Sequence, residues 1–266
     1  MQKYLNQTQI KQIFQIAEKC SFIAKKNFLN KNFQIFVKDD GSKVTSIDLE
    51  ISDLIGKELT SIFPNIPIIC EEKKLRDAKN TFFLIDPIDG TSSLIKNSEE
   101  FCINIALIIN KFPVFGIIYA PIFENGKFIF NDGNEVFIGK NSNFENALPI
   151  KSKQQKNFDS LKIITSPRTK MDLISNFCSQ HFSSSKIQQI ENLSSALKFF
   201  RIAEGDANLY IHPKRSMEWD TASGHAIVNA LGYEVNNFKI IDDKIIIESE
   251  LTYQKNNFEN SGFIIF

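Results

Sequence analysis

The most constraining feature of this chain is an apolar run that leads directly into two aspartates. Residues 82–85 have the composition of a buried strand, and the motif Asp-Pro-Ile-Asp-Gly-Thr follows at 86–91. Two carboxylates at the end of a buried strand repel each other and lose hydration, so a nearby cation is needed to make them favourable. The Gly-Thr pair offers backbone N–H groups and a hydroxyl, which suit a phosphate. The segment favours metal-assisted phosphoryl chemistry, although Asp-Pro and Asp-Gly are also common turn dipeptides.

Length and charge narrow the class of protein. The chain has 266 residues, enough for one large α/β domain or two closely packed lobes. Its formal net charge is zero, so no basic surface is expected for nucleic acid. An anionic substrate would need metal ions or a few well-placed cations.

The compartment can be inferred from the cysteines and the N-terminus. The four cysteines lie far apart without a Cys-x-x-Cys pair, which argues against a zinc site or a disulfide framework and fits a reducing compartment. No signal peptide or integral membrane segment is expected, because no uninterrupted apolar run follows a basic start. We therefore expect a cytoplasmic protein, with peripheral association at the inner membrane left open.

Hydrophobic periodicity predicts a mixed α/β chain in two parts. Helices are expected over 10–24, 45–59, 168–181, 195–204 and 220–231. Strands are expected over 66–70, 82–85, 101–109, 113–120, 127–130, 135–138, 161–165, 207–211, 233–240, 244–249 and 262–266. The close spacing of the strands between 101 and 138 predicts an antiparallel meander. A polar connection at 140–158 divides the chain into an N-terminal subdomain, 1–150, and a C-terminal subdomain, 151–266.

Two further acidic sites lie far from the first in sequence. Glu71 and Glu72 follow the short strand at 66–70, but lysines come next, and for this segment alone a solvated charge run is the better interpretation. Asp220 follows the only tryptophan at the start of a helix rich in small residues. Taken alone, Asp220 is best interpreted as an N-cap, although the same helix end would also keep its carboxylate ionised, as a metal ligand requires.

Taken together, Glu71, the Asp-Pro-Ile-Asp-Gly-Thr motif and Trp219-Asp220 resemble the inositol monophosphatase superfamily over essentially the whole chain. The resemblance implies a layered αβαβα sandwich and a Mg²⁺-dependent, Li⁺-sensitive phosphatase that binds two or three metal ions. The haloacid-dehalogenase motif Asp-x-Asp-Gly-Thr is a poorer match, because here two residues separate the aspartates.

The resemblance also implies roles for particular residues. Glu71, Asp86, Asp89, Asp220 and the Ile88 carbonyl are expected to be metal ligands, and oxygen ligands suit Mg²⁺. Thr91 and its partner Asp48 are expected to activate the attacking water, with Glu71 in the same catalytic set. Substrate contacts are expected from Gly90, Thr91, Ser92, Lys198 and Asp220. His181 and His212 are expected at the surface, and His225 either in the pocket or in helix packing.

Within the superfamily, the stretches 104–121, 195–210 and 219–226 resemble bacterial 3′(2′),5′-bisphosphate nucleotidases. Adenosine 3′,5′-bisphosphate is therefore the expected substrate, and Lys198 would bind its second phosphate unless it is an ordinary exposed helix lysine. Ser92-Ser93 departs from the Lys-Glu usual in those enzymes. An inositol phosphate or another small phosphate ester stays an alternative, as does a non-catalytic scaffold with the same fold. A monomer or homodimer is expected.

Overall fold

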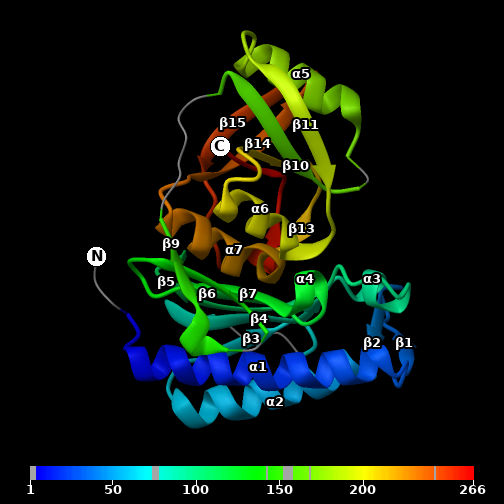
Figure 1. Ribbon diagram of the computed structural model, residues 1–266, viewed down its shortest axis with the longest axis vertical. Coiled ribbons are helices and arrows are strands. Elements are labelled where there is room, and N and C mark those ends of the chain that lie inside the picture. Colours follow the sequence, from blue (N-terminus) through cyan, green and yellow to red (C-terminus); the bar gives the residue numbers. More distant parts are fainter. Residues whose placement is uncertain (1–3, 74–77, 142, 152–157, 168, 243) are drawn as a thin grey trace.

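The protein is built of five alternating layers, seen edge-on in the computed structural model of Figure 1. The structure describes residues 4–73, 78–141, 143–151, 158–167, 169–242 and 244–266. Two helices cover one sheet, two more separate it from a second sheet, and a further helix lies on the outer face of that second sheet. The expected αβαβα sandwich is therefore confirmed.

The outer helical layer consists of α1 (Gln7–Leu29) and α2 (Ser46–Ile62). Each begins with a capping box, in which the side chain of the N-cap residue and that of the third helical residue each bond the other's backbone N–H. In α2 these residues are Thr45 and Asp48, so the helix start fixes Asp48 at a buried position, 1% exposed. Between the helices runs a two-stranded hairpin, β1 (Ile35–Val37) and β2 (Lys43–Thr45).

The first sheet has seven strands in sequential order, as expected for a meander. They are β3 (Ile68–Cys70), β4 (Thr81–Asp89), β5 (Cys102–Ile109), β6 (Phe112–Ala120), β7 (Lys127–Asn131), β8 (Val136–Lys140) and β9 (Leu148–Ile150). Only β3 and β4 pair in parallel, and the remaining pairs are antiparallel. The β4–β5 register shifts between Asp86 and Asp89. That irregularity lets both aspartates leave the regular alternation of the strand.

The second sheet has six strands in the order β11-β10-β12-β17-β14-β15. Their bounds are β10 (Ser160–Thr165), β11 (Lys186–Asn192), β12 (Leu209–His212), β14 (Val235–Ile241), β15 (Lys244–Glu250) and β17 (Phe263–Ile265). Helix α5 (Met171–His181) covers its outer face (Figure 1).

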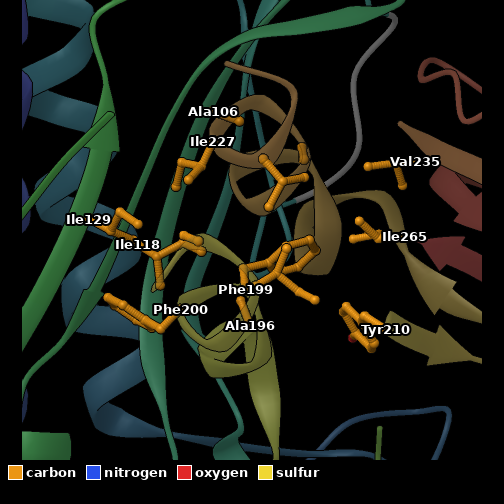
Figure 2. Close-up of a cluster of buried hydrophobic side chains, with 14 of the residues drawn as sticks. Ala106, Ile118, Ile129, Ala196, Phe199, Phe200, Tyr210, Ile227, Val235 and Ile265 are labelled. Atoms are coloured by element: carbon orange, nitrogen blue, oxygen red, sulfur yellow. The ribbon is translucent and has the colours of Figure 1, made fainter. Parts of the chain in front are cut away.

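The middle layer is formed by α6 (Lys198–Glu204), preceded by a 3₁₀ turn at Ser195–Leu197, and α7 (Glu218–Ala230). Figure 2 shows its apolar side chains between the two sheets, with Phe199, Phe200 and Ile227 facing strand residues such as Ile118 and Ile265. Helix α7 packs very closely, because a Cβ on Gly224 would overlap the Phe199 ring. The same helix also lies directly on the first sheet, because a Cβ on Gly116 of β6 would overlap the Ser223 backbone.

Most predicted elements are confirmed, and the misses have physical reasons. The β1–β2 hairpin was not predicted, because its strands are only three residues long. Strand β11 was missed because it is polar and largely exposed at a sheet edge, with no apolar alternation. Short segments add α3 (Thr91–Ile95), α4 (Phe123–Gly126), β13 (Ser216–Met217) and β16 (Glu259–Asn260). The boundary between 150 and 151 stays a prediction, and residues 152–157 of the expected connection lie outside the described residues.

Candidate active site

A pocket of about 520 Å³ lies where the N-terminal sheet meets the middle layer and the second sheet. From the N-terminal side it is lined by the end of β4 and the start of α3, including Asp89, Gly90 and Ser92. From the C-terminal side it is lined by Lys198 of α6 and Asp220 of α7. The fold thus brings together site residues that are more than 100 positions apart in the sequence.

Three predicted ligands converge, and two of them, Asp89 and Asp220, line this pocket. Carboxylate oxygens of Asp86, Asp89 and Asp220 all lie within 4.8 Å of one another. Asp86 is buried, at 2% exposed, whereas the other two are half-buried. Two come from the irregular end of β4 and the third from the first turn of α7, so the cluster exists only when both halves of the chain are folded together.

In each of the three carboxylates, one oxygen accepts hydrogen bonds from N–H groups of the protein. The Ile88 N–H donates to Asp86 Oδ1 at 3.0 Å, and the Met217 N–H donates to Asp220 Oδ2 at 2.9 Å. Asp89 Oδ2 accepts from the Asn104 amide at 3.1 Å and from the Ala196 N–H at 2.6 Å. Among the described residues, no N–H or O–H group donates to the other oxygen of any of the three. One oxygen per carboxylate is fixed by the protein and the other is available to a ligand.

The cluster is electrostatically unfavourable by itself. Burial and then the charges of Glu71, Asp89 and Asp220 raise the pKa of Asp86 well above its usual range. Burial likewise raises the pKa of Asp89 to about 6, although Lys198 opposes the shift. Burial, Asp89 and Glu71 raise the pKa of Asp220 in the same direction. Close anions in a low-dielectric site are costly unless a cation neutralises them.

Glu71 lies beside this cluster but is not one of the three mutually close acids. It follows β3, and its N–H donates to the Ile85 carbonyl at 3.2 Å. Lys38, on the β1–β2 hairpin, lies 3.2 Å from Glu71 and 2.7 Å from Glu72. The interpretation of Glu71-Glu72 as a plain solvated charge run does not hold, because both carboxylates pair with a lysine from a distant segment. Glu71 is near enough to influence the pKa of all three aspartates.

Thr91 and Asp48, which the family resemblance pairs, are in direct contact. The Thr91 hydroxyl lies 2.8 Å from Asp48 Oδ1 and 2.9 Å from the Ile88 carbonyl. The other oxygen of Asp48 accepts from the Thr45 N–H at 3.0 Å and from the Thr45 hydroxyl. Burial raises the pKa of Asp48, and the hydrogen bonds from Thr45 and Thr91 oppose that rise. The buried carboxylate can therefore orient the Thr91 hydroxyl so that its oxygen faces a proton donor.

The turn after Asp89 requires glycine. Gly90 has φ of 96°, and a Cβ there would lie 2.7 Å from the Glu100 carbonyl oxygen. This left-handed residue starts α3 and reverses the chain, which leaves Gly90 and Ser92 on the pocket wall. The structure is consistent with these residues reaching a substrate, and their contact with phosphate stays a prediction.

Lys198 is not an ordinary exposed lysine. It is 3% exposed and lines the pocket, and its Nζ donates to the carbonyls of Leu193, at 3.1 Å, and Ser195. Burial lowers its pKa, and the nearby carboxylates of Asp89 and Asp220 oppose that shift. A cation held in place beside the acidic cluster is suited to bind an anionic group of a substrate.

One pocket residue, His212, was misjudged from the sequence, and one partner of Asp89, Asn104, was missed. His212 was expected at the surface, but it is half-buried in the pocket wall, where Nδ1 lies 3.2 Å from the Ser166 hydroxyl and its ring stacks on Phe263. Burial, with Lys198 and Lys214, lowers the pKa of His212 to about 3. Asn104 was missed as a partner of Asp89. Its signal was an amide inside a strand that is otherwise almost entirely apolar.

The other two histidines differ in burial and lie outside the pocket lining. His181 is exposed, as expected. His225 is fully buried in α7, with Nδ1 3.1 Å from the Tyr253 hydroxyl, and it does not line the pocket. Helix packing, and not substrate binding, therefore explains His225.

The acidic cluster fits a hard divalent cation. Its donor set is entirely carboxylate oxygen, which suits Mg²⁺ and excludes the sulfur and imidazole chemistry of most zinc sites. The available oxygens of Asp86, Asp89 and Asp220 would hold such an ion, with Glu71 next to it.

The described residues contain no helix long and apolar enough to cross a membrane.

Comparison with known proteins finds similarity to one family of phosphatases. The sequence profile of the inositol monophosphatase family matches residues 5–259. The 3′(2′),5′-bisphosphate nucleotidase CysQ of Buchnera aphidicola is 31% identical over 256 residues, which cover 94% of this chain and 91% of that protein.

Solved structures show the same fold. CysQ from Bacteroides thetaiotaomicron, described as a bacterial member of the inositol monophosphatase family, superposes with a TM-score of 0.73 at 24% identity, covering 97% of both chains. A staphylococcal inositol monophosphatase-1, solved as a LiCl-soaked inhibitory complex, gives 0.69 at 19% identity, covering 93% of this chain and 85% of the other.

Proposed function

Because the chain belongs to the inositol monophosphatase family, we propose that it is a Mg²⁺-dependent phosphomonoesterase that removes the 3′-phosphate of adenosine 3′,5′-bisphosphate. The observation that carries the proposal is the convergence of three carboxylates within 4.8 Å at the pocket, beside the Thr91–Asp48 pair. The similarity to a bisphosphate nucleotidase, 31% identical in an alignment that covers 94% of this chain, supports the substrate class.

The metal site comes first in the proposed mechanism. Asp86, Asp89 and Asp220 would hold Mg²⁺, and Glu71 and the Ile88 carbonyl are the further ligands that we propose. When bound, Mg²⁺ ions polarise the phosphoryl group, lower the pKa of a coordinated water and stabilise the leaving oxygen.

The protein's own groups then handle the proton. The Thr91 hydroxyl, 2.8 Å from Asp48, donates its proton toward that carboxylate and presents its oxygen to the attacking water. Asp48 is held by two further hydrogen bonds from Thr45, so the pair does not need to reorganise during the reaction. The backbone amides of Gly90 and Thr91 are proposed to bind the phosphate, and Ser92 lies on the same wall.

Specificity for a bisphosphate is assigned to Lys198. A second phosphate would lie beyond the metal ligands, and the proposal that Lys198 pairs with it is supported by the burial of this ammonium in the pocket wall. His212 is neutral at physiological pH and adds polarity without charge.

A phosphate-release assay tests the reaction class. With Mg²⁺ the protein should hydrolyse adenosine 3′,5′-bisphosphate faster than 5′-AMP, inositol 1-phosphate or fructose 1,6-bisphosphate. EDTA should abolish the activity and Li⁺ should inhibit it. Absence of Mg²⁺-dependent release from every substrate would contradict the proposal and favour a non-catalytic scaffold.

Lys198→Met tests the substrate class, because methionine keeps most of the side-chain length without the charge. Loss of a charge-assisted contact should raise KM for the bisphosphate about 10- to 100-fold while changing KM for a small aryl phosphate far less. An equal effect on both substrates would assign Lys198 to the metal centre and favour the small-ester alternative.

A further inference from the structure

A second carboxylate of α7 lies two residues before Asp220 and has no part in the mechanism above. Glu218 is 0% exposed, although a fully buried charge is costly unless several groups bond it. It does not line the pocket, so it does not touch a substrate there. Its burial needs a separate explanation.

The partners of Glu218 are two consecutive backbone amides. The N–H of Gln254 donates to Oε2 at 2.8 Å, and the N–H of Lys255 donates to Oε1 at 2.9 Å. Gln254 has φ of 70°, a left-handed conformation that turns both N–H groups toward the same carboxylate. The Lys255 ammonium lies 3.7 Å from Oε1 and is itself held by Asn260 Oδ1 at 2.8 Å.

This cradle is tied to the N-terminal half of the protein. The Gln254 side-chain amide donates to the Ala78 carbonyl at 2.8 Å. Ala78 lies between Glu71 and Asp86 in sequence, on the segment that joins β3 to β4. Glu218 therefore connects the start of α7, through the backbone at 254–255, to the half of the protein that carries the other acids.

The first turn of α7 depends on these contacts. Met217, which precedes Glu218, donates its N–H to Asp220 Oδ2, so a shift of this turn moves the Asp220 carboxylate directly. The Glu218 carbonyl accepts from the Thr221 hydroxyl at 3.2 Å, and Asn260 donates to that same hydroxyl oxygen at 2.8 Å. Hydrogen bonds therefore hold the helix start on both sides of Asp220, at Glu218 before it and at Thr221 after it.

We propose that Glu218 is a positioning residue for the metal centre, whose carboxylate anchors the first turn of α7 to the amides of Gln254 and Lys255 and so holds Asp220 against Asp86 and Asp89. The inference rests on the proposed role of Asp220 as a metal ligand. Groups that orient metal ligands commonly affect metal affinity about 10- to 100-fold.

Calorimetric titration of the full chain with MgCl₂ tests this directly. Glu218→Gln keeps the side-chain size but turns one accepting oxygen into an N–H donor facing a backbone N–H. We expect Mg²⁺ affinity to fall about 10-fold or more, while kcat at saturating Mg²⁺ stays within about 3-fold of the unmodified protein.

Two further variants separate the possible outcomes. Ile227→Val removes one buried methylene from the same helix without touching the carboxylate, and it should lower the melting temperature but not the Mg²⁺ affinity. Asp220→Asn should abolish binding at the site. Unchanged Mg²⁺ affinity in Glu218→Gln, or equal weakening in Ile227→Val, would overturn the inference while leaving the proposed function intact. Normal Mg²⁺ binding by Asp220→Asn would overturn the proposed metal site and the inference with it.

Discussion

Two groups of carboxylates lie where the halves of the protein meet, and they differ in what neutralises them. In the first, Glu124 and Glu204 each accept from the Lys127 ammonium at 2.7 Å, and Arg201 donates to Glu124 at 2.7 Å. In the second, the three converging aspartates, Asp86, Asp89 and Asp220, form no ion pair with any lysine or arginine of the described chain. We call the first the paired cluster and the second the acidic cluster.

The difference appears in the pKa values. Partial burial would raise the pKa of Glu124, but the hydrogen bonds and charges of Lys127 and Arg201 lower it to about 2. In the acidic cluster, burial raises the pKa of Asp89 to about 6. The chain therefore supplies the cations where it needs only to join α4 to α6, and leaves carboxylate oxygens available where it must take a cation from solution.

Removing one acid from the acidic cluster should give the largest effect on activity. Asp89→Asn keeps the shape and removes one anionic ligand, so we expect kcat/KM to fall roughly 1000-fold or more, because several kcal/mol of charge stabilisation are lost. The metal-free protein should melt no lower than the unmodified one, because repulsion is relieved. Steady-state kinetics and thermal denaturation in EDTA measure the two effects. Full activity, or a large loss of stability, would show that the acidic cluster stabilises the fold, as the paired cluster does, and does not bind a catalytic cation.

Asp48→Asn should have the next largest effect. The amide can no longer accept a proton through Thr91, and loss of general-base assistance should lower kcat about 100-fold. The change also disturbs the capping box of α2, which Thr45→Ala disturbs from its other side. Similar kcat values for the two variants would show that the cap, and not the Thr91 contact, is responsible.

Removal of the cation from the paired cluster should affect stability more than catalysis. Lys127 is 1% exposed, and Lys127→Met leaves Glu124 and Glu204 facing each other, so we expect a loss of about 2 kcal/mol in the free energy of unfolding. Urea denaturation and kinetics at saturating Mg²⁺ check this. An unchanged free energy of unfolding together with a large fall in kcat would show that the paired cluster serves catalysis and not stability, which would contradict the account.

The smallest effect is a difference in pH dependence. Glu124, whose pKa is lowered to about 2, contributes stability that is present above pH 4.5 and is lost as the pH falls toward 2. Asp89, whose pKa is raised to about 6, acts with the opposite sign. In metal-free protein its favourable term is present below about pH 3.8 and disappears as the pH rises through about 6.

Two variants isolate these windows in urea denaturation. Glu124→Gln should flatten the stability curve on the acid side, and Asp89→Asn should flatten it between about pH 4 and 6. If both variants altered the same window, the two clusters would not differ in charge state as argued.

The sequence predicts the acidic cluster better than its surroundings. Asp86 and Asp89 were identifiable because a buried strand ending in two acids is costly. Asp220 alone would have been taken as an N-cap, and only its combination with Glu71 and the Asp-Pro-Ile-Asp-Gly-Thr motif predicted a ligand. Lys198 was identifiable as a charge near the pocket, but its burial was not, since its two carbonyl partners depend on the turn at 193–195.

What the sequence did not predict depends on contacts between distant segments. His212 was misjudged because its neighbours come from residue 166 and from strand β17. The Lys38–Glu71 pair and the Gln254–Ala78 contact likewise join segments that only the completed fold brings together. The paired cluster carries no local pattern that separates it from surface charge.

The most direct test of the account is the melting temperature with and without Mg²⁺, for the unmodified protein, Asp89→Asn and Glu124→Gln. At Mg²⁺ well above its dissociation constant, we predict a rise of about 5 °C for the unmodified protein and for Glu124→Gln, and no rise for Asp89→Asn. An absence of any rise in the unmodified protein, or an equal rise in Asp89→Asn, would contradict the claim that the acidic cluster is completed by a cation from solution.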